Sequence, residues 1–346
     1  MPKKGRFREA FPYEREEDFA HWAWMRRVVA PERSGEERLR ELERLEADAK
    51  AGDDRAALAF VRHLLKNPDE PRRFARARHL LSSPIQKEMP EALHLAGLMA
   101  LRGEGEPPDE EKALQLVERA AYLGRVEAML DAARLYESVF PDEKKSLYWW
   151  RLAAAHGVVS AQRKTGEKLL AAARGEEELK VARDMLERAA RDHDRDAAFL
   201  LFRLYARRGP LEDRDASLFW LKESALSGDT DAQYRLGILH WAGQRVPVNQ
   251  REAVRWIARA AEGGHFGAME MLANLFLSGS SVPVNRVYGC ALLRTAKRLG
   301  DKNAGDLLRT LTPLLKRRDF EEVRRLMREA PDAASLVEAI LPRRSR

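Results

Sequence analysis

Few residues of this 346-residue sequence have the types and spacing that catalysis or metal binding requires. The histidines show neither a His-x-x-x-His nor a His-Glu-x-x-His spacing, the patterns that place zinc ligands on one helix face. They are His21, His63, His79, His94, His156, His193, His240 and His265. The pattern favours a chain without a metal cofactor.

Three local motifs have an alternative interpretation as reactive or ligand-binding sites. The run "RDHDRD" holds Asp192, His193, Asp194 and Asp196, but it lies between two helical patterns, where a solvated turn is ordinary. The Gly-x-Gly in "RGEGEPPD" lacks the Lys-Ser/Thr of a phosphate-binding loop. Cys290 stands beside leucines, which is typical of a small core residue. We therefore expect no enzymatic activity and no cofactor.

The elements that carry these residues repeat along the chain. "DAQYRLGILHWAG" (231–243) aligns with "GAMEMLANLFLSG" (267–279), and the loop Val-Pro-Val-Asn occurs once after each motif. The same frame extends back through a series of alanines with spacings of 36, 36, 33, 36, 35, 36 and 36 residues. These anchor alanines are Ala56, Ala92, Ala128, Ala161, Ala197, Ala232, Ala268 and Ala304. This period, with helical apolar spacing inside it, predicts a stack of two-helix units.

A second helical pattern follows in each unit. In "REAVRWIARAAEGG", Ala253, Trp256 and Ala260 lie on one helix face, and small or apolar residues recur at these positions elsewhere. Glycines four residues before most anchor alanines predict left-handed helix ends, and His193 takes that position in a turn we expect to be looser. Asn or Asp at the equivalent of Asn249 predicts the N-cap of each second helix.

The combined pattern resembles the Sel-one-like repeat (SLR), a relative of the tetratricopeptide repeat (TPR). Residues 231–266 match best, and the resemblance spans about residues 50–302. The unit near Arg55, with "LLSSPIQ", and the unit from Ser160, with Lys168, depart from the pattern, so we expect irregular geometry there. The resemblance implies an all-α, right-handed superhelical solenoid of about seven helix pairs.

The family also implies a protein-interaction adaptor or scaffold whose first helices line a concave, peptide-binding groove. Tetratricopeptide repeats place groove residues two, six, nine and ten positions after each anchor alanine. The candidates in this sequence are Tyr234, Ile238, Trp241, Phe199, Arg203, Arg207, Leu130, Arg134, Leu58 and Arg62. Aromatic and arginine side chains dominate the energetics of many interfaces, so the expected ligand is an acidic, partly apolar protein segment. The alternative is that Tyr234 and Trp241 only pack on the next unit.

The repeats predict three regions: residues 1–34, a solenoid over 35–302, and residues 303–346 with closing helices and a basic tail. The first region is rich in aromatic residues, among them Phe11, Phe19, Trp22 and Trp24. It either covers the exposed apolar edge of the first unit or docks a partner or a second copy, and the sequence leaves both open.

Composition narrows the partners and the compartment. The net charge of +7 over 62 basic and 55 acidic residues permits nucleic-acid binding without requiring it. RNA binding by a helical-repeat protein with a basic surface is therefore the alternative function. A single cysteine excludes an internal disulfide, no run of apolar residues is long enough to span a membrane, and the amino terminus shows no signal-peptide pattern. These features favour a cytoplasmic protein, and the excess of arginine over lysine favours a bacterial source.

Overall fold

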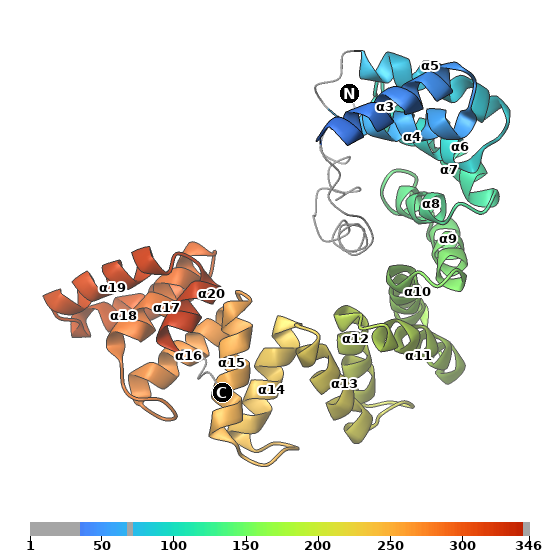
Figure 1. Ribbon diagram of the computed structural model, residues 1–346. Coiled ribbons are helices and arrows are strands. Elements are labelled where there is room, and N and C mark those ends of the chain that lie inside the picture. Colours follow the sequence, from blue (N-terminus) through green and yellow to red (C-terminus); the bar gives the residue numbers. More distant parts are fainter. Residues whose placement is uncertain (1–34, 68–71, 342–346) are drawn as a thin grey trace. The chain divides into compact units, whose positions relative to one another are not determined.

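The computed structural model describes residues 35–67 and 72–341, and within these ranges it contains helices and turns but no strand (Figure 1). The all-α prediction is therefore confirmed. The chain forms two compact units, residues 1–165 and 166–346. The boundary between the units falls inside a helix, α10 (Val159–Ala172). The predicted aromatic segment at residues 1–34 and the basic tail at 342–346 lie outside the described residues.

The described helices follow one another through short turns. Before α10 they are α3 (Gly35–Lys50), α4 (Asp54–Lys66), α5 (Arg73–Gln86), α6 (Pro90–Arg102), α7 (Glu110–Tyr122), α8 (Val126–Ser138) and α9 (Glu143–Ala155). After it come α11 (Glu176–Arg191), α12 (Arg195–Ala206), α13 (Arg214–Leu226), α14 (Thr230–Ala242), α15 (Gln250–Glu262), α16 (Phe266–Ser278) and α17 (Arg286–Arg298). The chain then continues with α18 (Ala304–Leu311), η1 (Thr312–Leu314), α19 (Arg317–Glu329) and α20 (Ala333–Ile340).

The predicted pairs correspond to helices α4 to α17, in which an even-numbered first helix precedes an odd-numbered second helix. Every anchor alanine is buried, and Ala232 and Ala268 have no exposed surface, as predicted. A side chain without branches lets neighbouring helices approach closely at this position. The register that the alanine spacing predicted is therefore the register of the packed helices.

A glycine five residues after the anchor alanine brings three of the pairs closer still. A Cβ atom on Gly97, Gly166 or Gly237 would lie 2.7–2.8 Å from a side-chain carbon of the second helix. In the α14–α15 pair that carbon belongs to Ile257, and the carbonyl oxygen of Ala253 would lie 3.2 Å away. These glycines are required by the distance between two helices rather than by backbone conformation.

The turns between units have the predicted left-handed residue. Gly264 has a φ of 87°, and the amides of Gly264 and His265 each donate to a carbonyl of the last turn of α15 at 3.0 Å. His193 holds the same conformation, with a φ of 65°, and its amide and that of Asp194 donate equivalent bonds at 3.1 Å. The prediction of a looser turn at His193 was wrong, because these backbone hydrogen bonds stabilise the turn without a glycine.

The two irregular units form helices as well. Pro84 lies inside α5, and Glu88 takes the left-handed position with a φ of 55°. The amides of Glu88 and Met89 still donate to the last turn of α5 at 2.9 Å. In the unit from Ser160, α11 begins after Gly175, which has no side chain to cap the helix. The departures thus change how the helices begin and end while the helix pair persists.

The side chains predicted as N-caps all accept hydrogen bonds from the first turn of the second helices. Asn249 accepts from the amide of Glu252 at 3.1 Å, and Asn285 accepts from the amide of Tyr288. Asp109, Asp142 and Asp213 do the same in their units. The Val-Pro-Val-Asn loop therefore has a structural role, since its asparagine starts the second helix.

The helices after the last pair close the apolar edge of the second unit. Leu336 and Ile340 of α20 belong to the same buried cluster as Ile257 of α15 and Leu292 of α17.

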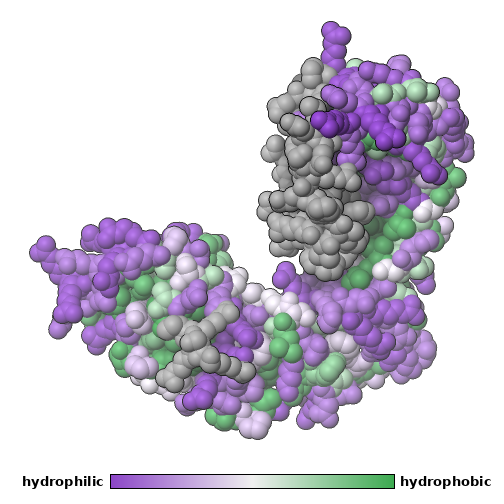
Figure 2. Space-filling model, in the orientation of Figure 1, coloured by the Kyte–Doolittle hydropathy of each residue, from purple (hydrophilic) through white to green (hydrophobic). Residues whose placement is uncertain are grey.

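On the visible face of both units, hydrophilic side chains dominate and hydrophobic ones gather in smaller patches (Figure 2). Within the described residues, no helix is long and apolar enough to span a membrane.

Candidate partner-binding surface

In the second compact unit, residues 166–346, the predicted residue Trp241 lies at an open pocket between the first helices of two successive repeats. The pocket holds about 560 Å³, and Met271 and Leu277 of α16 line it together with Trp241 of α14. The Trp241 side chain remains 43% exposed, although an indole of this size is ordinarily well buried. A large apolar side chain exposed beside an apolar pocket is what a docking surface requires.

Tyr234 is engaged differently, by the next unit. Its ring lies 4.5 Å from the ring of His265, at an angle of 30° between the planes. His265 is itself fixed, because Nδ1 accepts from the amide of Ala268 at 3.0 Å and Nε2 lies 3.1 Å from a carboxylate oxygen of Asp231. Tyr234 and Ile238 are both half-buried. For Tyr234 the packing alternative from the sequence thus has direct support, whereas Trp241 keeps an open face.

Phe199, Arg203 and Arg207 extend the first-helix face along α12. Phe199 packs against Phe202 with 5.6 Å between ring centroids, and the guanidinium of Arg235 on α14 lies 5.7 Å from the Phe199 ring. Arg203 and Arg207 are exposed, and both line a pocket of about 700 Å³ at the carboxyl end of α12. Arg203 and Arg207 therefore lie at an open pocket, whereas Phe199 is half-buried and does not line it.

In the first unit, Leu58 and Arg62 line another pocket of about 700 Å³, which α4 shares with residues 89–91 and 123–127. Leu58 is buried, so it forms the support of this pocket rather than an exposed contact. The Arg62 guanidinium pairs with the carboxylate of Glu91 at the start of α6, and Arg125 lies 3.7 Å from the other oxygen of that carboxylate. The charge of Arg62 is therefore already balanced within the unit.

Arg134 is also satisfied internally, through a buried pair that sequence reasoning missed. Asp131 is 1% exposed, and its carboxylate lies 2.7 Å from Nε2 of His94 and 3.3 Å from the Arg134 guanidinium. Arg125 donates to the other nitrogen of the His94 ring at 3.3 Å. Leu130, the remaining candidate of this unit, is half-buried against the core. The repeat register could have predicted this pair, since His94 and Asp131 follow successive anchor alanines by two and three residues.

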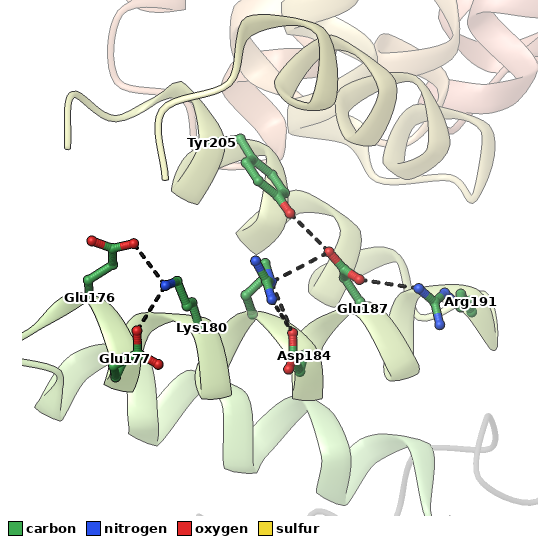
Figure 3. Close-up of polar contacts among 8 residues, drawn as sticks. Glu176, Glu177, Lys180, Asp184, Glu187, Arg191 and Tyr205 are labelled. Atoms are coloured by element: carbon green, nitrogen blue, oxygen red, sulfur yellow. Dashed lines mark hydrogen bonds and ion pairs between the residues drawn. The ribbon is translucent and has the colours of Figure 1, made fainter. Parts of the chain in front are cut away.

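Within each compact unit, a tyrosine hydroxyl joins the second helix of one repeat to the first helix of the next repeat. Tyr205 of α12 donates to Glu187 of α11 at 2.9 Å, and Tyr136 of α8 donates to Glu118 of α7 at 2.8 Å (Figure 3 shows the first pair). Burial, followed by the nearby carboxylate, raises the pKa of Tyr205 to about 12. Both hydroxyls are thus protonated donors, and their role is to hold stacked units together.

The three motifs with an alternative interpretation as reactive or ligand-binding sites hold residues with structural roles. Asp194 caps α12 by accepting from the amide of Ala197 at 2.8 Å. Gly103, the first glycine of the Gly-x-Gly motif, ends α6 in the left-handed conformation. Cys290 has no exposed surface, and burial raises the pKa of its thiol, which keeps it protonated. Within the described part of the chain, no group of three His, Cys, Asp or Glu side chains could hold a metal ion.

The candidate docking residues of the amino-terminal segment, Phe11, Phe19, Trp22 and Trp24, lie outside the described residues. Their part in capping or docking stays a prediction.

Comparisons with known proteins agree with the repeat architecture. The family model described as "Sel1 repeat" matches residues 90–124, 126–158, 195–229, 230–265 and 267–301. These segments correspond to the helix pairs α6–α7, α8–α9, α12–α13, α14–α15 and α16–α17. The two pairs without a match, α4–α5 and α10–α11, are those in which the sequence departs from the repeat pattern.

Two solved structures extend the likeness to the fold. A Sel1 repeat protein from Oxalobacter formigenes is 27% identical with a TM-score of 0.66, and the match covers 83% of this chain and 85% of that protein. The c5321 protective antigen of uropathogenic Escherichia coli, which displays an SLR fold, is 20% identical with a TM-score of 0.64, covering 88% and 67%. No curated protein matches the sequence significantly. Because the family model covers half of the chain, this protein belongs to the Sel1 repeat family.

Proposed function

We propose that this protein is a non-enzymatic scaffold or adaptor that binds a peptide or protein segment along its first helices. Sel1 repeats commonly serve as protein-interaction scaffolds, which supports the general class. The position of Trp241 is the observation that carries the proposal for this chain. Its indole is 43% exposed at an apolar pocket between α14 and α16. Covering this indole with a partner would remove apolar surface from water, which is favourable by about 25 cal/mol per Å².

RNA binding is the second candidate, and the exposed arginines of α12 are the observation that favours it. Phosphates and carboxylates both pair with guanidinium groups. A repeat code for bases would need similar polar side chains at equivalent positions. The position two residues after the anchor alanine instead holds Phe199, Tyr234 and Glu270 in successive units. The protein-binding function therefore has the stronger support.

We also propose roles for the two ends of the chain and a cellular compartment for the protein. Residues 1–34 form an arm that caps the first unit or docks a partner, 35–302 form the solenoid, and 303–346 close it. Removing residues 1–30 should lower the stability of the first unit if the arm is a cap. A truncated protein that is equally stable but loses a partner would identify a docking arm. We place the protein in the cytoplasm, supported by its single, buried cysteine.

The test begins with affinity purification of a partner and continues with calorimetric titration of variants. Trp241→Ala and Arg203→Glu should each weaken partner binding at least tenfold, about 1.4 kcal/mol, because both remove first-helix contacts. Phe219→Ala and Arg251→Glu are matched controls on second helices, where Phe219 is 52% exposed and Arg251 is exposed.

The controls should leave the affinity unchanged. If the control variants weaken binding and the first-helix variants do not, the partner uses the second-helix face and the proposal is wrong. Generic RNA gives the other comparison: tight binding with a steep dependence on salt would support the RNA alternative, because salt competes with phosphate contacts.

A further inference from the structure

Arginines gather at one pocket of the second unit. The pocket holds about 700 Å³ and lies at the carboxyl ends of α10 and α12 and the loops that follow them. Five arginines and a single acidic residue, Glu176, line it together with several leucines. The arginines are Arg174, Arg203, Arg207, Arg208 and Arg235. We call this site the arginine pocket.

Three of these arginines lack a protein partner within the described residues. No hydrogen bond or ion pair joins the guanidinium groups of Arg203, Arg207 and Arg208 to any described side chain or backbone group. The first-helix arginines of the first compact unit differ, because they have acidic partners: Arg62 pairs with Glu91, and Arg134 pairs with Asp131. Like charges that stand together without counter-charges repel one another, so an anion in this pocket would be stabilised by each of them.

The acidic residues that follow Arg208 are occupied, because Glu212 lies 3.9 Å from the Arg214 guanidinium and Asp213 caps α13. The carboxylates of α11 are occupied as well, as Figure 3 shows. Glu176 and Glu177 of α11 both pair with Lys180 at 2.9 Å. Glu187 accepts from Tyr205 at 2.9 Å and from Arg191 at 3.2 Å. The carboxylates of α11 are thus satisfied by α11 itself and by the tyrosine, which leaves the α12 arginines for an external anion.

The way in which α12 ends leaves the pocket open. First helices α6, α14 and α16 end in a left-handed glycine, and the loop after it folds back so that a proline or valine contacts that glycine. At the same position after α12 the sequence has Arg208, and Arg207 ends the helix in an extended conformation. The unit of α10 has Ala172 there. Two neighbouring units without the glycine turn therefore border the pocket.

The walls of the pocket define the rest of the ligand. Leu179, Leu200, Leu204 and Leu211 contribute apolar surface beside the guanidinium groups. Arg235 is stacked over Phe199 and Phe202, at 5.7 and 6.0 Å from their ring centroids, which fixes one charge at the edge of the pocket. A ligand that fits both features has adjacent anionic groups and an apolar side chain between or beside them.

We propose that the arginine pocket binds an acidic peptide segment of a partner protein, with carboxylates on Arg203, Arg207 and Arg208 and an apolar side chain among the leucines. The inference rests on the proposed function and specifies the chemistry of its ligand. Carboxylates suit the planar guanidinium because each can accept two parallel N–H bonds. A peptide supplies the apolar side chain as well, which a nucleic-acid backbone does not.

The first experiment uses a fluorescein-labelled synthetic peptide of alternating Asp-Glu pairs and leucines. The control peptide has Asn-Gln pairs in place of the Asp-Glu pairs. Both are titrated at about 0.15 M salt, where long-range electrostatic attraction is screened. The intact protein should bind the acidic peptide at least tenfold more tightly than the neutral one. The variant Arg203→Gln/Arg207→Gln should lose at least tenfold in affinity, and Arg251→Gln should not. Both substituted side chains are exposed, so circular dichroism and the melting temperature should match the parent.

Three results would overturn the inference: equal binding of the neutral peptide, unchanged binding by the double variant, or tighter binding of a single-stranded RNA of equal charge. The captured natural partner separates this inference from the proposed function. If Trp241→Ala weakens that partner and the double arginine variant does not, the pocket assignment is wrong and the scaffold function stands. If neither variant weakens it, both are wrong.

Discussion

Replacing Gly237 by alanine tests whether close approach of first and second helices organises each unit. Gly237 lies in the middle of α14, and a Cβ atom there would stand 2.7 Å from Cγ1 of Ile257 and 3.2 Å from the carbonyl oxygen of Ala253. Both residues belong to α15 and have no exposed surface. Ile257 is β-branched and has few alternative rotamers, so the helices themselves must move apart.

Two opposing effects set the magnitude. Alanine is favoured over glycine inside a helix by about 1 kcal/mol. Adding a methyl group to a well-packed contact costs about 1–3 kcal/mol. The clash involves a backbone oxygen and a stiff side chain, so we expect the packing cost to exceed the helix preference. The net result should be a loss of roughly 1 kcal/mol in the free energy of unfolding.

Gly305 provides the matched control, because it lies in helix α18 and a methyl group added there would meet no other atom within 4 Å. Gly305→Ala should raise the urea midpoint or leave it unchanged, whereas Gly237→Ala should lower it, with similar slopes for both. If Gly237→Ala is as stable as Gly305→Ala, the two helices are not in close contact at this glycine and the reasoning fails.

Three further predictions address the packing and the charges. Ala232→Leu should lower the free energy of unfolding by about 1–3 kcal/mol, measured by urea denaturation, because this position has no free volume. Tyr205→Phe should cost about 1 kcal/mol in the same assay, since Glu187 loses a hydrogen bond. Burial, followed by the nearby Asp301, raises the pKa of Glu270. The protonated form of Glu270 therefore stabilises the fold below the unfolded pKa of about 4.3. This contribution to stability is lost as the pH rises through the higher pKa of the folded state. Glu270→Gln should therefore melt at a higher temperature than the parent near neutral pH and converge with it towards about pH 4, and a constant difference across that range would contradict the assignment.

The repeat period was enough to predict the helix pairs, because it is set by backbone geometry and by small residues. Ala232 and Ala268 are buried where their spacing placed them, and the N-cap at Asn249 follows from the same register. The turn at His193 was predicted less well. A glycine preference is statistical, and the backbone hydrogen bonds of that turn stabilise a histidine in the left-handed conformation.

The candidate surface could be predicted as a row of positions but not as a set of free side chains. Arg62 and Arg203 occupy equivalent positions, six residues after an anchor alanine, yet one pairs with Glu91 and the other lines the arginine pocket. Which arginine finds a partner depends on acidic residues that reach across from the neighbouring unit. In the same way, Tyr234 packs on a histidine of the next unit, which the periodicity of its own helix does not reveal.

Hydrogen–deuterium exchange of the protein with and without its captured partner tests the proposed function most directly. If the partner lies along the first helices, exchange should slow in residues 203–213 and 238–245, which border the arginine pocket and the pocket at Trp241. The second helices α13 and α15 should exchange at the same rate with and without the partner. Protection confined to those second helices, with none at the pockets, would contradict a binding surface on the first helices.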